Sequence, residues 1–193
     1  MKTNRRIHPA WIAAIVTFFT LVATAGFRSA PSVLIIPLQD AFGWHRDQIS
    51  LAIAINVLLY GLTAPFAAAL MERFTVRKVV MGALTTVSTG AFLTTLIHAP
   101  WQLIATWGVI VGIGTGSMAL VFAATVANRW FVKRRGLVIG GLTAAAAMGQ
   151  LIFLPGLTHL SGMYGWKSIG LTIGAAALLM VPMIFVFLRE RPA

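Results

Sequence analysis

Cysteine is absent from this chain of 193 residues, and acidic side chains number four against fifteen lysines and arginines. The lack of cysteine excludes disulfides, thiolate metal sites and cysteine nucleophiles. Charged residues make up 10% of the sequence, whereas a soluble domain carries about 25%, so this chain cannot cover its surface with polar groups. Hydrophobic residues make up 59% and the mean hydropathy is +0.88, which predicts that a lipid bilayer surrounds the protein.

Motifs that carry enzyme chemistry are also missing. The sequence has no HExxH or GxSxG motif and no pair of carboxylates at catalytic spacing. The acidic residues and histidines all fall between apolar runs or at their ends, and they are Asp40, Asp47, Glu72, Glu190, His8, His45, His98 and His159. We therefore expect no enzyme activity, no catalytic residue, no bound metal or cofactor, and no buried carboxylate that could carry a proton across a membrane.

Long hydrophobic runs dominate what is present. A helix needs about 20 apolar residues to cross about 30 Å of hydrocarbon. The runs that meet this length lie at 11–38, 49–71, 79–97, 101–127, 137–159 and 167–188. The joints between them are too short for a separate soluble domain, so the sequence predicts an all-α membrane protein. We expect residues 1–193 to form a single domain of six transmembrane helices.

Basic residues predict the orientation of these helices, because cytoplasmic loops are enriched in lysine and arginine. If the chain crosses six times, twelve basic residues fall on the side of both termini, and only Arg46 and Lys167 fall on the other. We therefore expect both termini in the cytoplasm. A net charge of +11 would suit a nucleic-acid-binding protein, but here the basic residues form short clusters between apolar runs. We expect no nucleic-acid partner.

Arg28 is a cation inside the first apolar run. Burying arginine in a bilayer costs about 2.5–3.5 kcal/mol on insertion scales, so a chain that keeps one generally uses it. Polar residues at three- or four-residue spacing share its helix face, and they are Thr17, Thr20, Thr24 and Ser32. One hypothesis is that Arg28 lines a polar path and binds a planar carboxylate. The alternative is that its side chain extends to the lipid headgroups.

A second polar stripe lies in the second apolar run, where Asn56, Tyr60 and Thr63 share a helix face. Two interpretations are open. The three side chains form hydrogen bonds between helices, which contribute about 0.6–2 kcal/mol each in membranes. Alternatively, they line the same cavity as Arg28, in which case Asn56 and Tyr60 contact the substrate.

Small residues recur at four-residue spacing in the fourth and fifth runs. Gly108, Gly112 and Gly116 form one stripe, and Gly141, Ala145 and Gly149 form another. Stripes of this kind let helix backbones approach closely in lipid. We expect both stripes to lie in helix–helix interfaces.

The joint between the second and third runs, AALMERFTVRK at 68–78, is similar to the loop signature G-x-L-x-D-R-x-G-x-R-R of the major facilitator superfamily. Together with six spans and cytoplasmic termini, the joint resembles the N-terminal half of such a transporter. The resemblance implies that Glu72, Arg73 and Arg77 form a gating loop for conformational switching. Ala68 and Thr75 replace the signature's glycines, and Glu72 replaces its aspartate.

Two further stretches narrow the resemblance. The sequence GFRSAPSVLIIPLQDAFGWHRDQIS at 26–50 and the joint RWFVKRRGLVIGG at 129–141 resemble bacterial monocarboxylate and oxalate/formate-type porters. This implies a multi-pass protein of the bacterial inner membrane. It also marks Lys133, Arg134 and Arg135 as a cytoplasmic motif between the fourth and fifth apolar runs. The fifth run lacks the G-P-x-x-G-G sequence of drug/proton antiporters, which favours organic-anion movement over drug efflux.

Members of this superfamily consist of two six-helix halves, each built from inverted three-helix repeats, with substrate held between them. The resemblance therefore implies a secondary transporter, or its N-terminal half, that moves small organic anions such as monocarboxylates by alternating access. The expected partner is a second six-helix half, supplied by a continuation of the same chain, by a second copy or by another subunit. The alternative is a truncated or accessory membrane module that pairs with another half and transports nothing alone.

Overall fold

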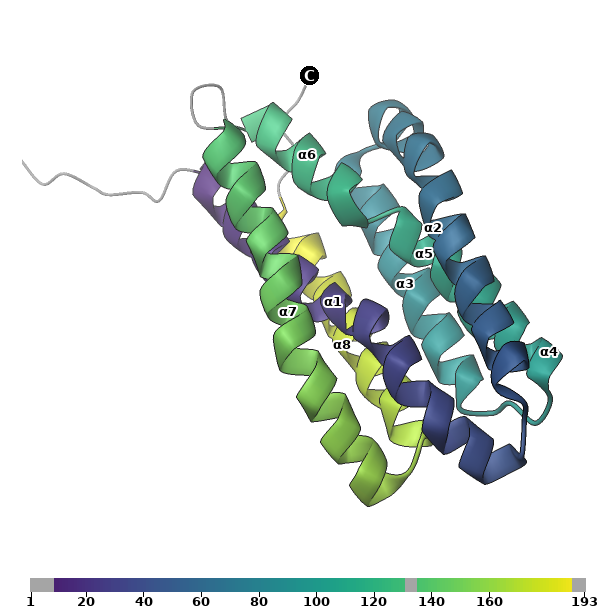
Figure 1. Ribbon diagram of the computed structural model, residues 1–193. Coiled ribbons are helices and arrows are strands. Elements are labelled where there is room, and N and C mark those ends of the chain that lie inside the picture. Colours follow the sequence, from purple (N-terminus) through teal and green to yellow (C-terminus); the bar gives the residue numbers. More distant parts are fainter. Residues whose placement is uncertain (1–8, 131–134, 189–193) are drawn as a thin grey trace, which may run out of the picture.

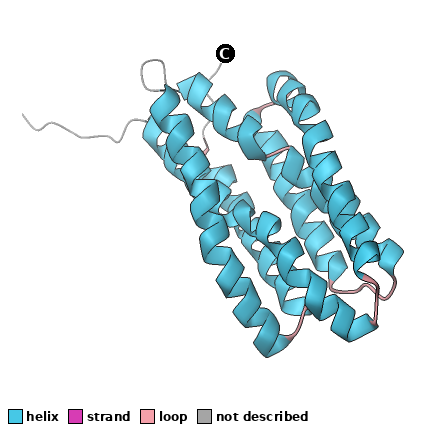
Figure 2. Ribbon diagram, viewed as in Figure 1, coloured by secondary structure: helices cyan, strands magenta, loops and turns pink. Residues whose placement is uncertain are grey.

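The computed structural model describes residues 9–130 and 135–188, which form helices joined by short loops, with no strand among them (Figures 1 and 2). The long helices are α1 (Pro9–Phe42), α2 (Arg46–Arg73), α3 (Val76–Thr94), α7 (Arg135–Tyr164) and α8 (Lys167–Phe187). A segmented rod between α3 and α7 contains α4 (Pro100–Leu103), the π-helix η1 (Ile104–Val111), α5 (Gly112–Gly116) and α6 (Ala119–Trp130). The predicted all-α class is confirmed. Lys133 and Arg134 lie outside the described residues.

In the part of the chain that the structure describes, four helices are long and apolar enough to cross a membrane, and they cover Trp11–Phe42, Arg46–Arg73, Arg135–Tyr164 and Lys167–Phe187. Helix α3 has 19 residues, but it carries Arg77 and Lys78 in its first turn and several hydroxyls, which lower its hydropathy. The rod is divided by η1 and by a turn at Ser117 and Met118, so none of its helices is long enough alone. Six spans therefore stay a prediction.

Two glycines set helix ends beyond the apolar runs. Helix α1 reaches Phe42, past the predicted end at residue 38, and the next residue, Gly43, has a φ of 66°. Its N–H donates to the Gln39 carbonyl at 2.8 Å. Gly165, with a φ of 80°, ends α7 in the same way through a 3.0 Å bond to Ser161. Glycine adopts this left-handed conformation without a Cβ clash, so the helices end where glycine permits the turn.

The helices pack in two groups that α3 and α8 join. Helix α1 packs along α7 and α8, whereas α2 packs along η1 and α5. Figure 1 shows α1 and α7 side by side, with α2, α5 and α3 forming the other group. Few residues of α1 contact α2 directly. The space between the two groups is therefore left to side chains from α1, α2, α5 and α7.

Glycines make the close helix contacts that the small-residue stripes predicted. A Cβ built on Gly116 would lie 2.6 Å from the Tyr60 carbonyl oxygen, and one on Gly149 would lie 2.6 Å from the Val22 carbonyl oxygen. Neither separation is possible for real atoms, so these backbones touch only because the side chains are absent. Gly141 is the exception, because a Cβ there would meet nothing within 4 Å. The stripes thus fix α5 against α2 and α7 against α1.

Candidate functional site

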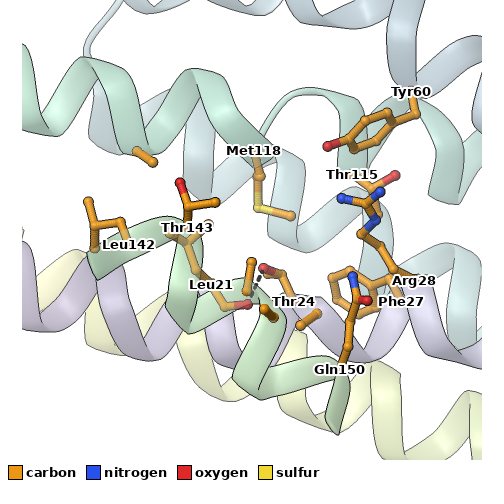
Figure 3. Close-up of a pocket in the computed structure, with 14 residues that line it drawn as sticks. Leu21, Thr24, Phe27, Arg28, Tyr60, Thr115, Met118, Leu142, Thr143 and Gln150 are labelled. Carbon is orange, nitrogen blue, oxygen red and sulfur yellow. Dashed lines mark hydrogen bonds between the residues drawn. The ribbon is translucent and has the colours of Figure 1, made fainter. Parts of the chain in front are cut away.

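Two cavities lie between the helix groups. The first, of about 320 Å³, extends along the middle of α1 on the N-terminal side of Arg28 and is lined by residues that include Leu21, Thr24, Met118, Thr143 and Gln150 (Figure 3). The second, of about 380 Å³, extends along the C-terminal half of α1 and is lined by residues that include Ser32, Ile35, Ile53 and Asn56. Both cavities share the side chains Phe27, Arg28, Tyr60 and Thr115. These shared side chains mark the place where the two cavities meet.

Arg28 and Tyr60 face each other at this meeting point. The Arg28 Cζ atom lies 5.3 Å from the centre of the Tyr60 ring, which is cation–π geometry. Figure 3 shows the guanidinium of α1 directed toward the ring of α2. Among the described residues that line either cavity, Arg28 is the sole charged side chain. The site is therefore an electropositive point in a wall of neutral groups, where an anion has one charged partner.

The polar stripe of α1 divides between the cavities and the helix interior. Thr24, Arg28 and Ser32 line the cavities. Thr17 and Thr20 are fully buried, and the Thr20 hydroxyl donates to the Val16 carbonyl at 2.8 Å. Neither of these two lines a cavity, so the polar path is shorter than the sequence spacing suggested.

The polar residues of α2 divide between the two roles that the sequence left open, which are hydrogen bonding between helices and lining the cavity beside Arg28. The Asn56 amide donates a 2.7 Å hydrogen bond to the Trp107 carbonyl in η1, and Asn56 also lines the second cavity. Tyr60 lines both cavities. Thr63 lines neither, and its hydroxyl donates to the Leu59 carbonyl of its own helix. Asn56 therefore ties α2 to the π-helical segment, a type of segment that often marks functional sites.

Helix α7 adds residues that sequence reasoning missed, namely Thr143 and Gln150. Both line the first cavity, and the Ser29 hydroxyl contacts the Gln150 carbonyl at 3.4 Å. A signal was available, because the two are the polar residues in the middle of an apolar run and lie seven residues apart, on one helix face. Thr115 was also missed, since the glycines around it indicated only packing. Figure 3 shows Gln150 and Arg28 among the side chains that line this cavity.

The predicted gating-loop residues lie at the other end of α2, away from the cavities. Glu72 and Arg73 end α2 and are exposed. Arg77, at the start of α3, places its Cζ atom 4.1 Å from the centre of the Phe185 ring in α8. This contact connects the joint between α2 and α3 to the end of the last helix. Arg135 opens α7 and is exposed.

Comparison with known proteins identifies the family. The family model described as Major Facilitator Superfamily matches residues 14–193. An uncharacterized MFS-type transporter, YcxA, from Bacillus subtilis is 27% identical over all of this chain. Monocarboxylate transporter 7 from Homo sapiens and monocarboxylate transporter 9 from Mus musculus are each 29% identical, over 89% and 87% of the chain.

This chain is shorter than those relatives. The matched region covers 47% of YcxA and 32% and 33% of the two monocarboxylate transporters. Because the family model covers nearly all of the sequence, the chain belongs to the major facilitator superfamily.

Proposed function

We propose that this chain is the N-terminal half of a secondary active transporter that moves small organic anions, such as monocarboxylates, by alternating access. The observation that carries the proposal is Arg28, the sole charged side chain among the described residues that line the two cavities. A guanidinium holds a planar carboxylate through two parallel hydrogen bonds. The names of two relatives, both monocarboxylate transporters, support the same class of substrate. Membership of this family also favours a transporter over an enzyme.

The Arg28–Tyr60 contact suggests how binding and access are linked. One cavity extends from this pair toward each end of α1. An arriving carboxylate competes with the Tyr60 ring for the guanidinium, because a bidentate ion pair is stronger than a cation–π contact of about 0.5–2 kcal/mol. Displacement of the ring then changes the wall between the cavities. In this proposal Arg28, Tyr60 and Asn56 contact or position the substrate.

The remaining parts of the proposal follow from the family. Six helices form one domain over residues 1–193, built as two inverted repeats of three, with both termini in the cytoplasm and the protein in a bacterial inner membrane. Glu72, Arg73 and Arg77 act as the gating loop, with Lys133, Arg134 and Arg135 on the same side. A second six-helix half covers the open side of the cavities, which would otherwise expose polar groups to lipid.

The orientation can be tested with single cysteines, because the native chain has none. His98 lies between α3 and α4, Lys78 lies at the start of α3, and both are exposed. With six spans, a membrane-impermeant maleimide added to intact cells labels His98→Cys, whereas Lys78→Cys reacts only after permeabilisation. Equal labelling of both in intact cells would contradict the six-span arrangement.

Entrance counterflow tests the transport activity. We expect proteoliposomes that contain the chain together with its second six-helix half, loaded with unlabelled pyruvate, to accumulate labelled pyruvate transiently, several-fold above protein-free vesicles. Labelled tetraethylammonium, an organic cation, serves as the control and is not accumulated, because Arg28 repels it. If pyruvate shows no counterflow while the chain forms a stable complex with another membrane protein, the accessory-module alternative replaces this proposal.

A further inference from the structure

The hydroxyl groups that line the two cavities donate their hydrogen bonds to backbone carbonyls of their own helices. Thr115 donates to the Val111 carbonyl at 2.9 Å, and Thr143 donates to the Ile139 carbonyl at 2.9 Å. Thr24 donates to Leu21 at 3.2 Å, and Ser32 donates to Ser29 at 2.7 Å. A hydroxyl has one proton and two lone pairs. Each of these groups can therefore accept a hydrogen bond from a ligand but has no proton left to donate.

Donors that face the cavities are few and lie close together. Within residues 9–130 and 135–188, the side-chain amide of Gln150 and the hydroxyl of Tyr60 form no hydrogen bond. Both belong to the wall that also holds Arg28. The Asn56 amide, one helical turn from Tyr60, donates one N–H to Trp107 and has a second N–H available in the second cavity. The donors thus cluster around the guanidinium, where a carboxylate would bind, and acceptors surround that cluster. A complementary ligand carries its acceptors at one end and donors on the rest of its skeleton.

The charge of the residues that line the cavities determines which kind of hydrogen-bond donor on a ligand they can accommodate. A ligand donor is either a neutral hydroxyl or a charged ammonium. An ammonium inside a membrane needs an anionic partner, and the described residues that line the two cavities include no carboxylate. A hydroxyl needs only the threonine and serine oxygens that are present. The lining therefore favours hydroxyl groups over ammonium groups.

We propose that this half prefers hydroxylated monocarboxylates over unsubstituted or 2-oxo monocarboxylates of the same length. Arg28 and Gln150 hold the carboxylate, and Thr24 and Thr115 accept hydrogen bonds from the hydroxyls of the ligand. A 2-oxo group can only accept a hydrogen bond. The threonine hydroxyls already donate their protons to the helix backbone, so a 2-oxo group in this position forms no hydrogen bond with them. This inference rests on the proposed organic-anion function and adds the chemical class of the substrate.

Competition binding tests the preference with three-carbon acids. Purified chain in nanodiscs is equilibrated with labelled pyruvate, and unlabelled glycerate, pyruvate and propionate compete. We expect glycerate to compete about tenfold better than propionate, the ratio that one or two net hydrogen bonds provide, and several-fold better than pyruvate. Competition in which all three acids are equal would overturn the hydroxyl preference but leave the anion function intact. If labelled pyruvate and labelled glycerate both fail to bind, the anion function itself fails.

Two threonines on α1 provide a matched pair of variants. Thr24→Val removes an acceptor from the cavity one helical turn from Arg28, and we expect it to reduce the glycerate-to-propionate ratio several-fold. Thr20→Val removes a similar hydroxyl that bonds its own helix but lines neither cavity, and we expect the ratio to stay unchanged. Gln150→Leu weakens binding of all three acids, since it removes a donor from the carboxylate. An unchanged ratio in Thr24→Val, or equal losses in both threonine variants, would contradict the assignment.

Discussion

Replacing Arg28 with alanine is expected to lower anion uptake by about 100-fold or more. The substitution removes two charge-assisted hydrogen bonds to the carboxylate, each of about 1.5–3 kcal/mol. It also removes the sole charge from the described lining of both cavities. Arg28→Lys keeps the charge but presents a point rather than a planar fork. We expect Arg28→Lys to retain part of the uptake.

Uptake of labelled pyruvate into vesicles, normalised to the amount of protein in the membrane, checks this result. Arg46→Ala is a suitable control, because Arg46 is exposed at the start of α2 and lines neither cavity. Its uptake should match that of the native chain. Unchanged uptake in Arg28→Ala would show that the guanidinium does not bind substrate, and would favour the alternative in which it extends to the lipid headgroups.

Replacing Gly149 with alanine is expected to destabilise the fold by about 1–3 kcal/mol, the usual effect of overpacking an interior. The added Cβ would lie 2.6 Å from the Val22 carbonyl oxygen and 3.0 Å from the Val22 Cα atom. Both are backbone atoms of α1, so no side-chain rotation relieves the clash. Helix α7 must shift away from α1, and the shift moves Gln150 relative to Arg28.

Gly140→Ala is the matched control on the same helix, because a Cβ there meets nothing within 4 Å. Alanine has the higher helix propensity, so this variant should gain about 0.5–1 kcal/mol. Thermal unfolding of both variants in detergent measures the difference: we expect a midpoint several degrees lower for Gly149→Ala and an equal or higher one for Gly140→Ala. Equal midpoints would mean that α1 and α7 do not pack as closely as the structure shows.

The loss of Gly149 should also affect binding, because the α1–α7 contact holds one wall of the first cavity. Ser29 of α1 contacts the Gln150 carbonyl beside that glycine. A sequence pattern could indicate that Gly149 lies in an interface, since the spacing of small residues on a helix is a local property. The same pattern included Gly141, which faces open space. The partner helix decides which small residues are in contact.

Composition and local spacing determined much about this protein. The scarcity of charge required a lipid environment, long apolar runs required helices, and a single arginine within one of those runs marked the candidate site. The loop at 68–78 indicated the superfamily that the family model then matched. These properties depend on residues within a few turns of one another, so the sequence carries them directly.

Only the tertiary structure decided which side chains meet. It placed Tyr60 of α2 over Arg28 of α1, added Gln150 and Thr143 of α7, and removed Thr17 and Thr20 from the site by burying them. The physical reason is that residue spacing determines which face of its helix a side chain occupies, but it does not determine which other helix packs against that face. The neighbour depends on how closely the helices approach, and here glycines without side chains set that distance.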